Sequence, residues 1–295
     1  MGLRMMVTGA SGTMGQELVK LLDKSGADFI AASRSLNRLP VGIRGLQLNY
    51  DSVPLLEQAF RDIDVLFFLQ PFAENMVPQA TNVFRAARSA GVQFVLRVSG
   101  FGASASSPYL YQRVQGEVDE LLKNSGLKYC LLRPNIFMQS FVTPWGEALR
   151  QGILYLPQGE GRTSFLHAKD AAEVAARILL DPLRFHKFSV DLTGERALSN
   201  AEAVSLISYE VQRRVCYVPV TEDVAIKSMQ KSGIEPWDID LMMSIHRAVK
   251  DGKTDEVSES FRQLMNRDPR RFEDFIKESR DAWIPPTPVL EPPLL

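Results

Sequence analysis

The chain has 295 residues and lacks several features that specialised proteins need in quantity. It holds only two cysteines, Cys130 and Cys216, both in apolar strand-like runs, so we expect buried, reduced thiols rather than a disulfide scaffold. Its 34 basic and 35 acidic residues leave no basic surface for nucleic acid or an anionic membrane. The longest apolar run, residues 65–69, is too short to span a bilayer. These features predict a soluble, cytoplasmic protein.

Two kinds of catalytic motif are also missing from the sequence. His186 and His246 have no cysteine or histidine partners at metal-ligand spacing, so no metal site is expected. The serine hydrolase elbow G-x-S-x-G is absent, because Ser99-Gly100-Phe101-Gly102 does not match it. Metal-dependent chemistry and serine hydrolysis are therefore disfavoured.

What the chain does have is a regular alternation of strand and helix patterns between residues 3 and 192. The strands are predicted at 3–8, 28–33, 45–49, 64–69, 92–99, 127–133 and 188–192. The helices between them are predicted at 13–24, 52–61, 74–90, 108–124 and 170–180, the last with Asp170 as its N-cap. This alternation predicts an α/β fold, a Rossmann-type doubly wound parallel sheet. The residues that follow the strands, Gly9, Arg34, Gln70, Ser99 and Asn135, should then meet at one edge.

The segment after residue 193 changes to helical patterns. Ser199 to Glu202 form a capping-box pattern, and Thr221 precedes another helix. Apolar stripes at 237–249 and 257–265 predict two more helices, and Asp268-Pro269 is typical of a fifth helix start. We therefore predict a nucleotide-binding domain at 1–192 with a cleft-forming connection at 139–165, then a mostly helical lobe at 193–283. Residues 284–295, which hold five prolines, should form an extended tail.

The first strand leads into a glycine-rich turn and a helix, spaced Gly9-x-x-Gly12-x-x-Gly15. The free N–H groups and dipole at a helix N-terminus attract a phosphate. Gly9 would permit the tight turn, Gly12 a close approach to pyrophosphate, and Gly15 close packing of helix on strand. The alternative, a tight turn that binds nothing, is disfavoured by the position between a strand and an amphipathic helix.

The second strand ends in Ser33-Arg34, with Arg38 close behind and no carboxylate between Asp28 and Asp51. NAD sites place an acidic residue there for the ribose 2′-hydroxyl, whereas an arginine accommodates a 2′-phosphate. A guanidinium binds phosphate through paired hydrogen bonds, so NADPH/NADP is favoured over NAD. The alternative is that Arg34 is an ordinary solvated arginine.

These motifs resemble the NmrA-like branch of the atypical short-chain dehydrogenase/reductases. The resemblance rests on the glycine motif, on Leu-Lys-Tyr-Cys-Leu-Leu-Arg-Pro-Asn-Ile-Phe-Met at 127–138, on Phe-Leu-His-Ala-Lys-Asp at 165–170 and on Arg-Phe-Glu-Asp-Phe at 271–275 with Ala282-Trp283. Within that branch the chain is most similar to the triphenylmethane-reductase and festuclavine-dehydrogenase type.

The resemblance implies a role for each position of the cofactor site. Pyrophosphate contacts would come from Gly9, Ser11, Gly12, Thr13 and Met14, and Tyr50 would flank the adenine. Gln70, Pro71 and Ser99 would lie along the nicotinamide ribose, with Pro134, Asn135 and Ile136 near the nicotinamide.

The chain departs from its relatives at the catalytic pair. Many of them carry Tyr-x-x-x-Lys, whose spacing places both groups on one helix face and whose lysine lowers the tyrosine pKa. Here Tyr111 falls at the tyrosine position and Gln115, which is uncharged, at the lysine position. An offset pair, Tyr109 and Arg113, has the same spacing, but Arg113 is expected to be a solvated helix residue. Carbonyl reduction by the usual tyrosine acid is therefore disfavoured.

Two functional hypotheses follow. The first is an NADPH-dependent reductase of a small imine, iminium or conjugated cationic substrate, which accepts hydride without an acid. Its catalytic residues would be Ser99, Tyr111 and Asn135, and its substrate contacts Phe137, Tyr111 and His167, although His167 is also readily explained as a structural histidine. The alternative is a non-catalytic NADP(H)-binding redox sensor. The sequence leaves open the substrate, the pathway and the oligomeric state, for which a homodimer is one option.

Overall fold

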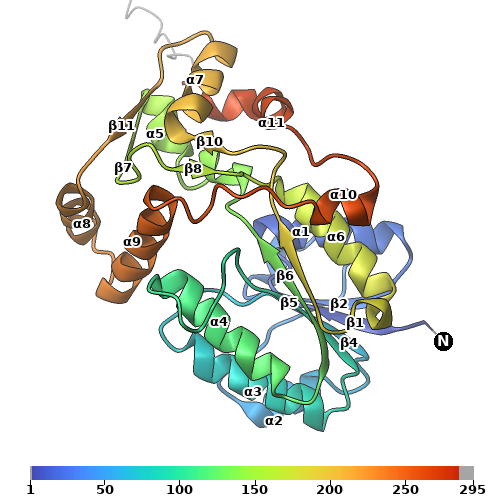
Figure 1. Ribbon diagram of the computed structural model, residues 1–295. Helices are drawn as coiled ribbons and strands as arrows, with labels where there is room; N and C mark the ends of the chain where they lie inside the picture. Colours follow the sequence, from blue (N-terminus) through green and yellow to red (C-terminus); the bar gives the residue numbers. More distant parts are fainter. Residues whose placement is uncertain (1, 286–295) are drawn as a thin grey trace, which may run out of the picture.

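A computed structural model describes residues 2–285 of the chain. Seven parallel strands form one sheet in the order β3-β2-β1-β4-β5-β6-β9 (Figure 1). They are β1 (Arg4–Val7), β2 (Asp28–Ala32), β3 (Gly45–Leu46), β4 (Val65–Phe68), β5 (Phe94–Val98), β6 (Lys128–Pro134) and β9 (Phe188–Leu192). The predicted Rossmann-type sheet is confirmed. The strand order reverses between β1 and β4, which is the position where such sheets bind ligands.

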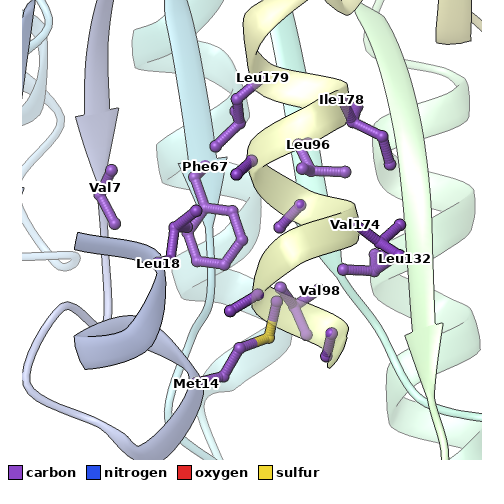
Figure 2. Packing of buried hydrophobic residues seen from close by; sticks show 14 of the residues in the cluster. Val7, Met14, Leu18, Phe67, Leu96, Val98, Leu132, Val174, Ile178 and Leu179 are labelled. Carbon is purple, nitrogen blue, oxygen red and sulfur yellow. The ribbon is translucent and has the colours of Figure 1, made fainter. Parts of the chain in front are cut away.

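Helices cover both faces of the sheet. On one face lie α1 (Thr13–Lys24) and α6 (Ala168–Leu180), and on the other α2 (Val53–Ala59), α3 (Met76–Ser89) and α4 (Leu110–Lys123). Because successive strand residues point to opposite faces, Met5 and Val7 pack under α1 and α6 while Met6 packs under α2 and α3. Figure 2 shows the first of these cores, in which Leu18 of α1 lies beside Phe67 of β4 and Val174 of α6 lies beside Leu132 of β6.

Glycines let α1 approach β1 closely. Gly9 has φ +66°, a conformation that favours glycine. A Cβ at Gly15 would lie 2.1 Å from the Gly9 carbonyl oxygen, so any larger residue would push the helix from the strand. The roles predicted for Gly9 and Gly15 thus follow from backbone geometry.

The remaining elements form the upper part of Figure 1. The helices are α5 (Gly146–Gln151), α7 (Asn200–Glu210), α8 (Glu222–Lys231), α9 (Pro236–Lys250), α10 (Ser260–Met265) and α11 (Phe272–Ser279). Short 3₁₀ helices lie at Leu36–Arg38, Met138–Phe141, Pro182–Phe185 and Arg280–Trp283. Among residues 2–285, no helix is both long and apolar enough to cross a membrane.

Two small sheets, which the sequence patterns did not indicate, tie this region together. β7 (Ile153–Leu156) pairs in parallel with β11 (Cys216–Pro219), and β8 (Arg162–Thr163) pairs antiparallel with β10 (Leu198–Ser199). The 139–165 connection therefore folds with the segment after 193. Cys216, expected to be buried, is only half-buried in β11.

Some helix boundaries confirm the prediction and others correct it. Ser199 and Glu202 form the predicted capping box of α7, and the Thr221 side chain caps α8. The prediction of a helix start at Asp268-Pro269 is wrong, because α11 begins at Phe272. The predicted tail lies outside the described residues except for positions 284 and 285.

The prediction that Asp170 caps α6 is also wrong. The helix begins at Ala168. Its N-cap is His167, whose Nδ1 accepts the Lys169 N–H at 3.1 Å. Asp170 lies in the first turn, fully buried, and pairs with the guanidinium groups of Arg267 and Arg270. It therefore links α6 to the C-terminal region.

Candidate active site

The carboxyl ends of β1, β2 and β4 open into a groove of about 750 Å³. Ten residues predicted to bind the cofactor line it: Gly9, Ser11, Gly12, Thr13, Ser33, Arg34, Arg38, Tyr50, Gln70 and Pro71. They come from four separate turns of the chain, which parallel strand ends bring to one edge. The groove thus gathers these ten residues into one continuous surface. Of the other predicted cofactor residues, Pro134 and Ile136 line a separate cavity and Ser99 lines neither.

The N-terminus of α1 faces this groove. Gly12 is the N-cap, no side chain caps the helix, and its first turn has no acidic residue. Orphan N–H groups beside an uncharged turn can receive a phosphate. The Met14 side chain, however, is buried in the core under the sheet, so only its backbone is available for the predicted pyrophosphate contact.

The turn after β2 presents hydroxyl and guanidinium groups. Ser33 Oγ donates to Ser11 Oγ at 2.7 Å and accepts the Ser35 N–H at 3.1 Å. The first of these hydrogen bonds links the turn after β2 to the glycine-rich turn after β1. Arg34 and Arg38 are exposed, and neither side chain forms an ion pair with the residues that the structure describes. Both guanidinium groups are therefore free to bind a phosphate that enters the groove.

Sequence reasoning missed nine further groove residues: Gln16, Ala32, Leu48, Asn49, Asp51, Leu69, Phe72, Ala73 and Gln79. Asp51 is held by Gln79, whose Nε2 donates to Asp51 Oδ1 at 3.0 Å. Gln70 Nε2 donates to the Met76 carbonyl at 2.9 Å, whereas its buried Oε1 has no hydrogen-bond partner within residues 2–285. Asn49 ends a predicted strand, Asp51 comes just after it, and Phe72 follows Gln70-Pro71. Their positions at or after strand ends could therefore have identified them as groove residues.

A second, mainly apolar cavity of about 240 Å³ lies between the end of β6, α4 and α9. It is lined by Phe101, Tyr111, Gln112, Pro134, Asn135, Ile136, Ser140, Pro144, Trp145, Gln158, Met242, Ile245, His246, Ala248 and Thr254. None of these residues is an aspartate, glutamate, lysine or arginine. The cavity therefore suits an uncharged or delocalised aromatic molecule rather than a compact ion.

One aromatic contact places the groove beside the cavity. Phe72 lines the groove and Tyr111 lines the cavity, and their ring centroids are 5.3 Å apart. The Tyr111 backbone is itself held against α9, because its N–H donates to Ser244 Oγ at 2.9 Å. The groove and the cavity are therefore neighbours, separated by the contact between Phe72 and Tyr111.

A buried charge network lies beneath this wall. Asp119 accepts hydrogen bonds from Arg97, from Arg133 Nη2 at 2.8 Å and from Ser99 Oγ at 3.0 Å. The other guanidinium nitrogen of Arg97, Nη2, donates to Gln115 Oε1 at 2.6 Å. Arg97 and Asp119 are 2% and 1% exposed, so each charge depends on its partners. The Ser99 hydroxyl hydrogen and the Gln115 carbonyl are committed to this network.

Tyr111 is an unsuitable acid in these surroundings. Burial raises the pKa of Tyr111 to about 12, and the nearby positive charge of Arg97 offsets this only in part. Gln115, at the expected lysine position, is bound to Arg97 and adds no charge. The offset pair, Tyr109 and Arg113, does not interact as a catalytic pair would. The Tyr109 hydroxyl donates to Asp251, and the Arg113 guanidinium donates to the Ser107 carbonyl.

The other predicted catalytic and substrate residues fall into two groups. Asn135 lines the cavity, but its Nδ2 donates to Ser164 Oγ and to the Thr254 carbonyl, both at 2.8 Å, so both amide hydrogens are used. Phe137 and His167 do not line the cavity. Phe137 packs against the core under α6, and buried His167 caps that helix. Both substrate contacts therefore stay predictions from the sequence.

His246 is a cavity residue that sequence reasoning passed over as an isolated histidine. Its Nδ1 lies 2.7 Å from Gln158 Nε2. Burial lowers the pKa of His246 to about 4, although the negative charge of Glu222 acts in the opposite direction. The imidazole is therefore uncharged at neutral pH.

This low pKa has a consequence for stability. In the unfolded chain the His246 pKa returns to its ordinary value of 6.5, so the unfolded state takes up a proton first as the pH falls. The stabilisation is complete above pH 6.5 and is lost as the pH falls towards 4. When the pH is lowered from 7 to 5, protonation of His246 in the unfolded chain should lower the free energy of unfolding by about 1–2 kcal/mol. Urea unfolding at both pH values should show this loss in the natural chain and a smaller one in His246→Gln; equal losses would contradict the assignment.

Comparison with known proteins agrees with this geometry. The NmrA-like family model matches residues 2–276. An NAD(P)H azoreductase of Xenophilus azovorans is 29% identical over 283 residues, which cover 94% of this chain and 98% of that protein. The structure of an Escherichia coli NADPH-dependent quinone oxidoreductase with bound NADPH matches with a TM-score of 0.83 at 21% identity, and the match covers 93% of this chain and 99% of the oxidoreductase. The structure of Citrobacter sp. triphenylmethane reductase matches with a TM-score of 0.82 at 20% identity, and the match covers 95% of this chain and 100% of the reductase.

The matched region extends from before β1 into α11, so it includes the groove, the cavity and the elements that close over them. The resemblance seen in the sequence motifs is thereby confirmed over nearly the whole chain. The chain belongs to the NmrA-like family.

Proposed function

We propose that the chain is an NADPH-dependent reductase that passes hydride from a nucleotide in the groove to a small conjugated organic acceptor in the apolar cavity. The observation that carries this proposal is the Phe72–Tyr111 contact, which brings the groove beside the cavity. The nicotinamide would lie at that end of the groove. The names of the relatives, an azoreductase, a quinone oxidoreductase and a triphenylmethane reductase, support the same reaction class.

The residues in the groove fit a dinucleotide phosphate. The N-terminus of α1 would hold the pyrophosphate, and Arg34 with Arg38 would bind the 2′-phosphate that distinguishes NADPH from NADH. Gln70, whose buried Oε1 lacks a partner, is placed to accept a hydrogen bond from the nicotinamide half. When bound there, NADPH would supply a hydride, and these residues would hold it beside the acceptor.

The acceptor class follows from the absence of a tuned acid. Tyr111 is held neutral and Gln115 cannot lower its pKa, so an acceptor that needs no oxygen protonation is favoured. An iminium ion, a protonated imine or a conjugated cation meets this condition, because hydride addition neutralises it. The rings of Phe101, Tyr111 and Trp145 supply faces on which a delocalised cation can lie.

The acid-free mechanism predicts that Tyr111→Phe retains most of the activity on a cationic dye such as malachite green. The hydroxyl would contribute neither a proton nor charge stabilisation, so kcat should change by less than about fivefold. Steady-state rates at saturating NADPH measure this. A drop of about 10³-fold would restore the tyrosine as general acid.

The same assay separates a reductase from a redox sensor. A reductase consumes NADPH in step with loss of dye, and Arg34→Ala should slow it at limiting NADPH. A protein that binds NADPH tightly but turns over neither a cationic dye, a quinone nor an azo dye would instead be a sensor. The cytoplasmic location and the homodimer stay predictions from sequence.

A further inference from the structure

One polar group in the apolar cavity is fixed by a relay of buried amides. Asn200 Nδ2 donates to Gln158 Oε1, and Gln158 Nε2 donates to His246 Nδ1 at 2.7 Å. Gln158 and Asn200 are each 1% exposed, so solvent does not compete for these hydrogen bonds. The three side chains come from the 139–165 connection, α7 and α9, and of the three Gln158 and His246 line the cavity.

The relay sets the tautomer of His246. Because Nδ1 accepts a hydrogen bond, the neutral ring carries its hydrogen on Nε2. Nε2 has no hydrogen-bond partner among residues 2–285, and the ring lines the cavity. Burial keeps the pKa of His246 near 4, against the opposing charge of Glu222, so this N–H persists at neutral pH.

Tyr111, Ser140 and Trp145 also have side-chain donors at the cavity, but no relay of buried hydrogen bonds among residues 2–285 fixes them. Two further polar groups are already used within the protein. Both amide hydrogens of Asn135 are used within the protein, and the Thr254 hydroxyl donates to the Arg162 carbonyl at 2.9 Å. Of the lining groups, His246 combines a free donor with a position fixed by a buried relay. A preorganised donor of this kind stabilises negative charge without reorganising.

We propose that His246 Nε2–H donates a hydrogen bond to the acceptor oxygen or nitrogen of a neutral, flat, conjugated substrate such as a quinone or an azo compound. This rests on the proposed reductase function and widens its substrate class beyond cations. Hydride carries two electrons from NADPH to the substrate, leaving NADP⁺ and a substrate anion whose charge lies on that oxygen or nitrogen. His246 keeps its proton, and water supplies the one that completes the product.

The two substrate classes make different demands on His246. A neutral acceptor gains negative charge as hydride arrives, so a donor at the charged atom lowers the barrier. A cationic dye loses its positive charge in the same step and develops no anion. Removing the donor should therefore slow reduction of neutral acceptors much more than reduction of cations.

The kinetic test compares His246→Phe with the natural chain on 1,4-naphthoquinone and on malachite green, at saturating NADPH. We expect kcat/KM to fall about 10²-fold for the quinone, and the loss for the dye to be smaller by at least about tenfold. His186→Phe is the matched control, since His186 lies outside the cavity, against the edge of Tyr129. Equal losses on both substrates, or no loss on the quinone, would overturn the proposal.

A conservative variant separates hydrogen bonding from a purely structural effect. His246→Gln keeps a neutral N–H donor in the cavity, so it should recover kcat/KM for the quinone to within about tenfold of the natural chain. A variant that unfolds or distorts the cavity would lose both substrates together. Failure of glutamine to recover any quinone activity, while dye reduction stays normal, would also count against a hydrogen-bond role.

A spectroscopic test does not depend on turnover. Imidazole ¹⁵N–¹H spectra of the full chain should show His246 as the Nε2–H tautomer, and 1,4-naphthoquinone should shift that resonance whereas naphthalene should not. An Nδ1–H tautomer, or no response to the quinone, would overturn the inference. If neither the quinone nor the dye is reduced by the natural chain, the reductase proposal fails while these spectra still decide the role of His246.

Discussion

Replacing Asp119 by asparagine is expected to lower the free energy of unfolding by about 3–5 kcal/mol, because it leaves a buried guanidinium without its counter-charge. Asp119 is the carboxylate to which Arg97, Arg133 and Ser99 all donate. Arg97 is 2% exposed and cannot turn to solvent for a replacement partner. Its own pKa is lowered to about 10 by burial, despite the opposing charge of Asp119.

Urea unfolding of two further variants tests this explanation. In the double variant Arg97→Met with Asp119→Leu the charge and its partner are removed together, so at least half of the lost stability should return. Lys123→Ala breaks the partly exposed pair between Lys123 and Glu120 and should cost less than about 1 kcal/mol. A cost for Asp119→Asn as small as that of Lys123→Ala would show that the buried network is not needed for stability.

Arg34→Ala is expected to weaken NADPH binding by about 10- to 100-fold, the range for hydrogen bonds to a charged group. NADH lacks the 2′-phosphate, so its binding should change by less than about threefold. Arg34 is exposed on the groove wall, and Arg38 stands near it, so the double variant should lose more than either single change. Arg184→Ala, which removes an exposed guanidinium outside the groove, is the control. Equal losses for both nucleotides would exclude a 2′-phosphate contact.

The fold and the groove could be predicted because they depend on neighbouring parts of the chain. Buried parallel strands are continuous apolar runs such as Val65–Phe68, and the topology rule places their ends together. The boundary of α6 was missed because aspartate is a stronger N-cap signal than histidine. Only the structure shows that Asp170 is instead required by Arg267 and Arg270, about a hundred residues away.

The cavity could not be predicted, because distant segments form it. Gln158 and His246 are 88 positions apart, and no local pattern relates them. The buried network did leave a trace, since Arg97 interrupts an otherwise apolar strand and Asp119 falls on the buried face of α4. A charge in a fully buried strand needs a partner, and this was a signal that sequence reasoning left unused.

The central claim is that the groove binds a phosphorylated nicotinamide nucleotide for use in reduction. Calorimetric titration of the full chain with NADPH, NADP⁺ and NADH tests it most directly. We predict tight binding of NADPH, little discrimination between NADPH and NADP⁺, and NADH weaker by at least about tenfold. Equal affinity for NADH would contradict the assignment of Arg34, and no binding of any nucleotide would contradict the account as a whole.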